Sequence, residues 1–156
     1  YTIIRIFGSY GPNQNLTWWG GPQALFIEKA FKNKEIEIHG DGLQTRTFTF
    51  IEDTVDGFFR AVTMREAVND IFNVASEPDE EITIIGLANF IWKMVNGTDK
   101  AKVKFIPYAT FGNYEDVRRR VPDITKIKAK LGFSPSYNLE SGMRKTIEWQ
   151  KNLMNY

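Results

Sequence analysis

The chain begins with a continuous run of apolar and β-branched residues. Residues 1–7 (YTIIRIF) have the pattern of a strand buried on both faces of a parallel sheet. A parallel strand needs a neighbour, and residues 71–75 (IFNVA) are the next segment that can supply one. Because two strands make a poor parallel sheet, we expect this chain to be cut from a larger α/β protein whose other strands lie upstream.

Apolar residues recur at steps of three and four in five later segments, which predicts amphipathic helices. The predicted helices cover residues 23–31, 53–65, 84–96, 124–131 and 139–153. Asp53, Thr83 and Asp123 stand where N-caps are expected, and Gly97 and Gly132 stand where two of these helices should end.

Shorter patterns fill the segments between these helices. Residues 36–38, 48–50 and 103–106 are predicted to be short strands. Residues 8–15 and 20–22 are dense in glycine, proline and asparagine, so we expect a long loop after the first strand. The order of elements predicts an α/β fold.

Composition and charge narrow the functional classes. With 156 residues, 42% of them hydrophobic, the chain is long enough for one domain with its own core. Its 20 Lys and Arg nearly balance 19 Asp and Glu, so no overall field attracts nucleic acid or an anionic membrane. The most apolar stretch, residues 82–95, is too short to span a bilayer. We expect a soluble, cytoplasmic protein.

The counts of two residue types exclude further chemistry. The chain has no cysteine, which excludes disulfides, thiolate zinc sites and thiol catalysis. It has one histidine, His39, which argues against a metal site built from several imidazoles and against a histidine-containing catalytic triad in this chain.

Three local features can hold a phosphorylated ligand. They are the glycine-rich loop at residues 8–15, the turn at 40–48 that carries Arg46, and the run of arginines at 118–120. Each has a structural alternative: an ordinary turn, a solvated surface cation, and a salt-bridged cluster offset by Glu115 and Asp116.

Together these segments resemble a known family. Residues 5–12 (RIFGSYGP), 38–53 (IHGDGLQTRTFTFIED), 72–75 (FNVA), 120–133 (RVPDITKIKAKLGF) and 146–149 (TIEW) occur in the order found in NAD-dependent epimerase/dehydratases. These are extended short-chain dehydrogenase/reductases that act on nucleotide-diphosphate sugars. The motifs are most similar to those of UDP-glucose 4-epimerases and UDP-glucuronate decarboxylases.

The resemblance implies the C-terminal portion of such an enzyme. Residues near 1–12 and 52–76 would belong to the last strands of a Rossmann-type parallel sheet, and the rest to a small α/β domain that binds a nucleotide-diphosphate sugar such as a UDP-sugar. The chain has no Gly-x-x-Gly-x-x-Gly loop for NAD and no Tyr-x-x-x-Lys pair, which in the family supplies the acid/base chemistry. NAD would therefore be bound mainly by the missing part. The isolated chain is expected to be inactive, and its parent to be a homodimer.

The resemblance also assigns substrate contacts. Arg46 resembles the arginine that contacts the diphosphate or ribose, and Arg120 the second diphosphate arginine, with Arg118 as a competing choice. Gln44 belongs to the same turn as Arg46.

Two further positions depart from the family pattern. His39 stands where relatives usually have an aromatic ring against the base, and it can also be an exposed strand residue. Gly8 stands where relatives usually have an asparagine that reaches the substrate, a contact that glycine cannot make.

Of the adjacent Trp18 and Trp19, at most one is expected to face a sugar. A stand-alone nucleotide- or carbohydrate-binding module is the alternative to an enzyme portion.

Overall fold

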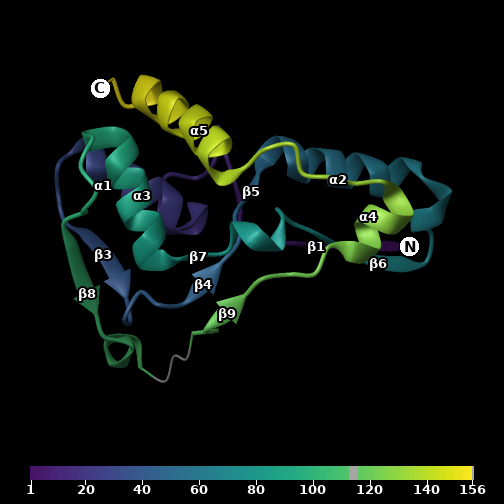
Figure 1. The fold of residues 1–156 in the computed structure, drawn as a ribbon, viewed down its shortest axis with the longest axis horizontal. Helices are drawn as coiled ribbons and strands as arrows, with labels where there is room; N and C mark the ends of the chain where they lie inside the picture. Colours follow the sequence, from purple (N-terminus) through teal and green to yellow (C-terminus); the bar gives the residue numbers. More distant parts are fainter. Residues whose placement is uncertain (113–115, 156) are drawn as a thin grey trace.

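The computed structural model describes residues 1–112 and 116–155, which form a mixed α/β structure (Figure 1). Its helices are α1 (Pro22–Phe31), α2 (Ile51–Thr63), α3 (Ile84–Asn96), α4 (Thr125–Leu131) and α5 (Leu139–Leu153). Short 3-10 turns are η1 (Trp18–Gly20), η2 (Arg65–Ala67), η3 (Pro78–Glu80) and η4 (Tyr108–Phe111). The strands are β1 (Thr2–Ile6), β2 (Ser9–Tyr10), β3 (Ile36–His39), β4 (Thr45–Arg46), β5 (Thr49–Phe50), β6 (Asp70–Val74), β7 (Ile82–Thr83), β8 (Val103–Ile106) and β9 (Arg119–Arg120).

Parallel pairing dominates the strands, as the sequence pattern predicts. Strand β1 pairs with β6 in register from Thr2 opposite Asp70 to Ile6 opposite Val74. Strands β2 and β5, and β3 and β8, form two more parallel pairs. Strand β4 lies between β7, which is antiparallel to it, and β9, which is parallel. The predicted partnership between the first strand and residues 71–75 is therefore confirmed.

The expectation that β1 is buried on both faces is wrong for this chain. Ile3 and Ile6 are 45% and 47% exposed. Strand β6 is the only neighbour of β1 among the strands that the structure describes. A parallel strand is buried only where other layers cover both faces of its sheet.

Two hydrophobic clusters organise the molecule. The larger lies between α1, α3, α5 and strand β3, and contains Phe26, Ile38, Leu87, Ile91 and Met143 among others. The smaller lies where α4 packs on β6, and contains Phe72, Val74, Ile127, Leu131 and Phe133 among others. Figure 1 shows the first group of elements on the left and the second on the right, with the sheet β7-β4-β9 between them.

The helix ends of α3 agree with the prediction. The Thr83 hydroxyl accepts a hydrogen bond from the Gly86 backbone N–H at 3.0 Å, which caps the start of the helix. Gly97 ends it in the left-handed conformation with φ of 73°. The predicted strand at 48–50 is shorter in the structure, where only Thr49–Phe50 form β5, and Thr45–Arg46 form a separate strand, β4, outside the predicted segment.

The prediction that Asp53 caps its helix is wrong. Helix α2 begins at Ile51, and Asp53 lies inside its first turn with 3% of its surface exposed. Its carboxylate accepts hydrogen bonds from the backbone N–H groups of Ser136 at 2.8 Å and Tyr137 at 3.1 Å. Burial raises the pKa of Asp53. Asp53 therefore connects α2 to the segment that leads into α5.

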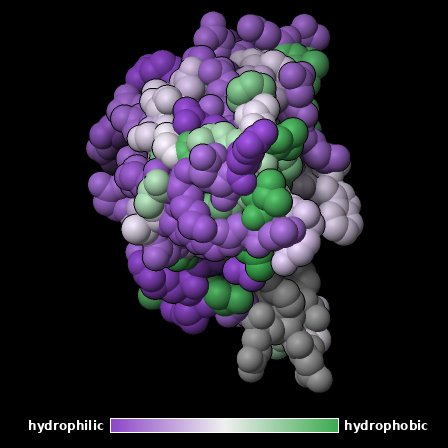
Figure 2. All heavy atoms as spheres, turned by 90° about the vertical axis from the view of Figure 1, so that its right-hand side faces the viewer, coloured by the Kyte–Doolittle hydropathy of each residue, from purple (hydrophilic) through white to green (hydrophobic). Residues whose placement is uncertain are grey.

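Helix α2 presents its bulky apolar side to the surface. Val55, Phe59 and Val62 are 58%, 66% and 81% exposed. The opposite side is made of small residues such as Gly57, where a Cβ would lie only 2.6 Å from the side chain of Val74 on β6. Figure 2 views the molecule from the end that carries β1, α2 and α4, and shows hydrophobic side chains among the hydrophilic surface.

Candidate functional site

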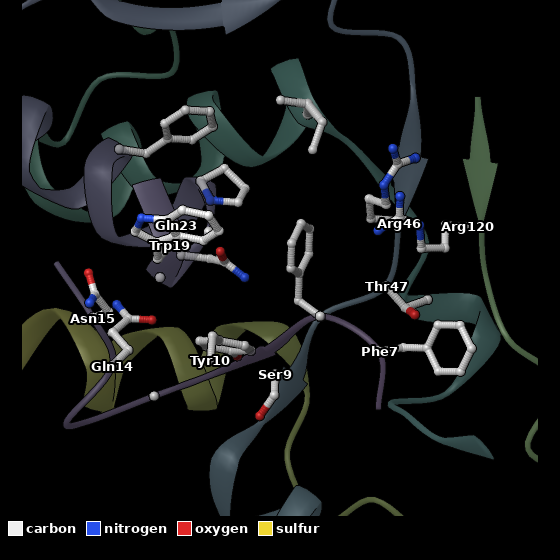
Figure 3. Close-up of a pocket in the computed structure, with 18 of the residues that line it drawn as sticks. Phe7, Ser9, Tyr10, Gln14, Asn15, Trp19, Gln23, Arg46, Thr47 and Arg120 are labelled. Atoms are coloured by element: carbon white, nitrogen blue, oxygen red, sulfur yellow. The ribbon is translucent and has the colours of Figure 1, made fainter. Parts of the chain in front are cut away.

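A cleft of about 740 Å³ is the candidate site. Its walls come from the turn after β1 with the loop that follows β2, the start of α1, the end of β3, and the segment from β4 to Phe48. Tyr108, Asp116 and Arg120 complete the lining. Figure 3 shows side chains from these segments converging on the cleft.

Gly8 holds the turn at one wall of this cleft. Its φ is 55°, and a Cβ at this position would lie 2.4 Å from the backbone oxygen of Thr47. The carbonyl of Gly8 accepts a hydrogen bond from the Thr49 N–H at 3.0 Å. A left-handed residue pressed against another backbone strongly favours glycine. Gly8 lines the cleft, and its backbone joins the β1 turn to the β5 segment.

Arg46 is anchored inside the cleft by an ion pair. Its Nη2 donates to Asp116 Oδ1 at 2.8 Å, and its Nη1 donates to its neighbour's carbonyl, Thr45 O, at 2.7 Å. Both charged side chains are only 12% exposed. The other oxygen of Asp116 accepts a hydrogen bond from the hydroxyl of Tyr108 at 3.0 Å. This network fixes the guanidinium plane at the cleft wall.

Gln44 and His39 continue the same network. Gln44 Nε2 donates to the backbone oxygen of His39 at 3.0 Å and to Tyr108 Oη at 3.1 Å. His39 is half-buried at the end of β3, and both residues line the cleft. The Gln44 side chain is buried, yet its Oε1 has no hydrogen-bond partner among the described residues.

The run of three arginines separates into different environments. Arg118 pairs with Asp41, with distances of 2.9 and 3.0 Å to its two carboxylate oxygens, and Arg119 pairs with Glu81 at 2.8 Å. These partnerships hold the pKa values of the Asp41 and Glu81 carboxyls below their usual range. Arg118 and Arg119 lie outside the cleft lining and form salt bridges at the surface, with Asp41 and Glu81 as their partners.

Arg120 differs from its two neighbours. It lines the cleft and lies directly opposite Arg46 in the parallel pairing of β9 and β4 (Figure 3). Among the residues that the structure describes, no carboxylate or side-chain hydrogen-bond partner of Arg120 is found. The predicted offset by Asp116 goes to Arg46 instead, and Glu115 lies outside the described residues.

Sequence reasoning missed three polar side chains in the lining. Gln23 and Thr47 are each 2% exposed, and Gln23 Oε1 and Thr47 Oγ1 lack hydrogen-bond partners in the described protein. Both amide atoms of Gln14 are buried and unpaired in the same sense. The available signal was the position of two glutamines within a glycine-rich loop and at the start of the helix behind it.

Trp19 stands at the rim of the cleft. It is 88% exposed and belongs to the lining, while the side chain of Trp18 lies outside what the structure describes.

Two other properties of the described residues bear on function. None of their helices combines the length and apolar character needed to cross a membrane, and their His, Asp and Glu side chains form no cluster suited to a metal ion.

Comparison with known proteins now decides the family. The sequence model described as GDP-mannose 4,6 dehydratase matches residues 1–146, which is nearly the whole chain. The chain belongs to this family. The resemblance to epimerase/dehydratases that the sequence motifs indicate is therefore confirmed.

Individual relatives agree with this family. A UDP-N-acetyl-α-D-glucosaminuronate decarboxylase of Bacillus cytotoxicus is 32% identical over 99% of this chain and 47% of its own length. A UDP-glucuronic acid decarboxylase of Danio rerio is 31% identical over 94% of this chain and 32% of its own length. The chain thus spans half or less of the length of these relatives.

Solved structures show the same fold. The UDP-glucose 4-epimerase of Thermotoga maritima, solved with UDP-glucose, has a TM-score of 0.84 and 31% identity over 99% of this chain and 47% of its own. The UDP-glucuronic acid 4-epimerase of Bacillus cereus, solved with UDP-glucuronic acid and NAD, has a TM-score of 0.82 and 25% identity over 97% of this chain and 45% of its own. The α/β class with Rossmann-type strands is confirmed.

Proposed function

We propose that this chain is the substrate-binding portion of an NAD-dependent enzyme that epimerises, dehydrates or decarboxylates a nucleotide-diphosphate sugar such as UDP-glucose. Relatives named for such reactions match the chain over nearly its whole length. The observation that carries the proposal is the pair of arginines, Arg46 and Arg120, that line one cleft from adjacent parallel strands.

Charge explains why this pair suits a diphosphate. Two guanidinium groups on neighbouring strands repel each other unless anions lie nearby. Asp116 offsets Arg46, and Arg120 has no described carboxylate partner. A diphosphate brings two negative charges, and guanidinium groups bind phosphate oxygens through two parallel N–H donors. We therefore assign the diphosphate to Arg120 and Arg46, and we set Arg118 aside because Asp41 already holds it at the surface.

The remaining substrate contacts follow from this placement. His39 at the end of β3 offers a half-buried ring to the nucleoside, and Gln44, just before β4, offers an unpaired amide oxygen. Gly8 contributes backbone and space at the opposite wall, where a side chain would meet Thr47. Thr47 adds a buried hydroxyl without a described partner.

NAD is assigned to the part of the parent enzyme that this chain does not contain. No Gly-x-x-Gly-x-x-Gly loop and no Tyr-x-x-x-Lys pair occur in the sequence, so the residues present do not fit the NAD pyrophosphate. The exposed apolar side chains of β1 and α2 support a larger parent, since they offer the rest of a Rossmann-type domain a surface to pack on.

The parent is further proposed to be a cytoplasmic homodimer that binds neither nucleic acid nor membrane. The near-neutral net charge of +1 supports the absence of a polyanionic partner. Light scattering of the full-length parent tests the dimer, and a strictly monomeric parent contradicts it.

Calorimetric titration of UDP-glucose into the 156-residue chain tests the central proposal. Arg120→Ala should weaken binding by about 10-fold or more, the range for losing a hydrogen bond to a charged group. Arg120→Lys should recover part of the lost affinity, because lysine keeps the positive charge but cannot form bidentate hydrogen bonds to a phosphate. Arg119→Ala is the matched control, since it removes the neighbouring arginine outside the cleft. Equal effects of the two alanine variants would contradict the site.

A further inference from the structure

We infer that Gln14 and Gln23 form an amide subsite that hydrogen-bonds the ring hydroxyls of the ligand's sugar. This inference rests on the proposed function and names the residues that would distinguish a sugar nucleotide from the nucleotide alone. The subsite comprises Gln14, Asn15, Trp19 and Gln23, all of which line the cleft.

The geometry separates this subsite from the arginines. In Figure 3 the side chains of Gln14, Asn15, Trp19 and Gln23 lie on one side of the cleft, and Arg46 and Arg120 lie on the other. Gln23 belongs to the first turn of α1, and the remaining three belong to the loop between β2 and α1.

Unpaired buried atoms are the observation that points to a ligand. Gln23 is 2% exposed, and its Oε1 has no hydrogen-bond partner in the described protein. The Nε2 and Oε1 atoms of Gln14 are also buried and have no hydrogen-bond partner in the described protein. A buried polar atom without a partner destabilises the fold, so such atoms are rare and call for a specific reason. The three unpaired amide atoms of Gln14 and Gln23 lie on one side of the cleft, and a bound ligand that supplies their hydrogen-bond partners would explain them.

The loop holds these amides in fixed positions. Gly21 has φ of 83°, and a Cβ there would lie 2.7 Å from Gln23 Oε1. Gly20 packs so closely on the loop that a Cβ would overlap the backbone oxygen of Asn15 at 1.6 Å. The two glycines therefore bring the loop against the start of α1 and leave room for the Gln23 amide oxygen.

The chemistry of the subsite fits a sugar ring. None of its four side chains carries a charge, so it offers nothing to offset a phosphate. An amide presents a donor and an acceptor in one plane, which matches the hydroxyl groups of a sugar, each of which both donates and accepts. The exposed indole of Trp19 at the rim adds an apolar face for the C–H side of the ring. Because the sugar is attached directly to the diphosphate, a ligand whose diphosphate lies at the arginines extends its sugar across the cleft toward this subsite.

Titration of two ligands into matched variants tests this subsite. We compare UDP-glucose with UDP in the wild-type chain, in Gln23→Met and Gln14→Met, and in the control Gln150→Met. Gln150 is a buried glutamine of α5 that also has an unpaired Oε1 but lies outside the cleft lining. Its Nε2 donates to the backbone oxygen of Ala24 at 2.9 Å, so Gln150→Met controls for the loss of a buried amide that packs on α1 without facing the ligand. Methionine keeps the length of the side chain and removes its hydrogen bonding, so Gln23→Met should retain its fold with an undiminished Tm.

The expected result is selective. The wild-type chain should bind UDP-glucose more tightly than UDP, and both cleft variants should lose about 10-fold in UDP-glucose affinity while their UDP affinity stays unchanged. Gln150→Met should change neither. Equal losses for the two ligands would place the amides against the nucleotide, and unchanged UDP-glucose binding would make them structural; either overturns the subsite and leaves the arginine assignment standing. A wild-type chain that binds neither ligand would refute the proposed function itself.

Discussion

The ion pair between Arg46 and Asp116 should contribute measurably to folding before any ligand binds. The two side chains meet at 2.8 Å and are each only 12% exposed. Removing one partner of a buried pair costs about 3–5 kcal/mol, because the other charge stays buried without an opposite charge. Asp116 would keep the hydroxyl of Tyr108 and faces a cleft, so Arg46→Ala should lower the free energy of unfolding by about 2–3 kcal/mol.

A double-mutant cycle isolates the interaction itself. Urea unfolding of the wild type, Arg46→Ala, Asp116→Ala and the double variant should give a coupling free energy of about 1–3 kcal/mol. The pair of Arg118 with Asp41 is the matched control, because its side chains are 59% and 49% exposed. Its coupling should be about 0–1 kcal/mol and should fall in concentrated salt, whereas the coupling of the cleft pair should persist.

The outcome decides between two views of Arg46. If the coupling free energy between Arg46 and Asp116 is no larger than that of the control pair, water screens charges in the cleft as strongly as it does at the surface. The repulsion between Arg46 and Arg120 would then be screened, and no diphosphate would be needed to offset it. A large coupling supports a cleft in which charges interact strongly.

Three further outcomes are expected. Asp53→Ala should lower the free energy of unfolding by about 2 kcal/mol in urea, because two backbone N–H groups before α5 lose their acceptor; an unchanged value would contradict the role of Asp53. Lys126 and Lys130 lower the pKa of Asp70, so this carboxylate stabilises the fold above its unfolded pKa of 3.8 and the contribution is lost as the pH falls below it. Asp70→Asn should therefore show a smaller drop in Tm between about pH 6 and pH 3 than the wild type, and an equal drop would count against the pairing. The purified chain should neither convert UDP-glucose or UDP-glucuronic acid nor retain NAD, and product in a chromatographic assay would overturn this.

The sequence by itself determined the features that depend on local interactions. The extent of α3 follows from its apolar periodicity between Thr83 and Gly97, and the structure confirms both ends. The pairing of β1 with residues 71–75 also followed, since few segments have the pattern of a parallel strand. The family followed from the ordered motifs that the comparisons confirm.

The tertiary structure decided which side of each element faces the cleft or the core. The apolar stripe of α2 correctly predicted a helix, but the helix packs through Gly57 and exposes Val55, Phe59 and Val62. Periodicity states that a helix has an apolar side and does not state what covers it. Asp53 looked like a cap because its hydrogen-bond donors, the N–H groups before α5, lie more than eighty residues away in the sequence.

The same limit applies to the site. The family resemblance favoured Arg120 and left Arg118 as a competing choice, and the pairing of β9 with β4 places Arg120 in the cleft and Arg119 beside Glu81. Successive residues of a strand point to opposite faces, so a shift of the register by one residue would exchange them. Gln14 and Gln23 gave no signal that they lack partners, because burial without a hydrogen bond is a property of the packed chain. Local patterns fix elements, whereas the identity of each residue's neighbours comes from contacts between segments far apart in the sequence.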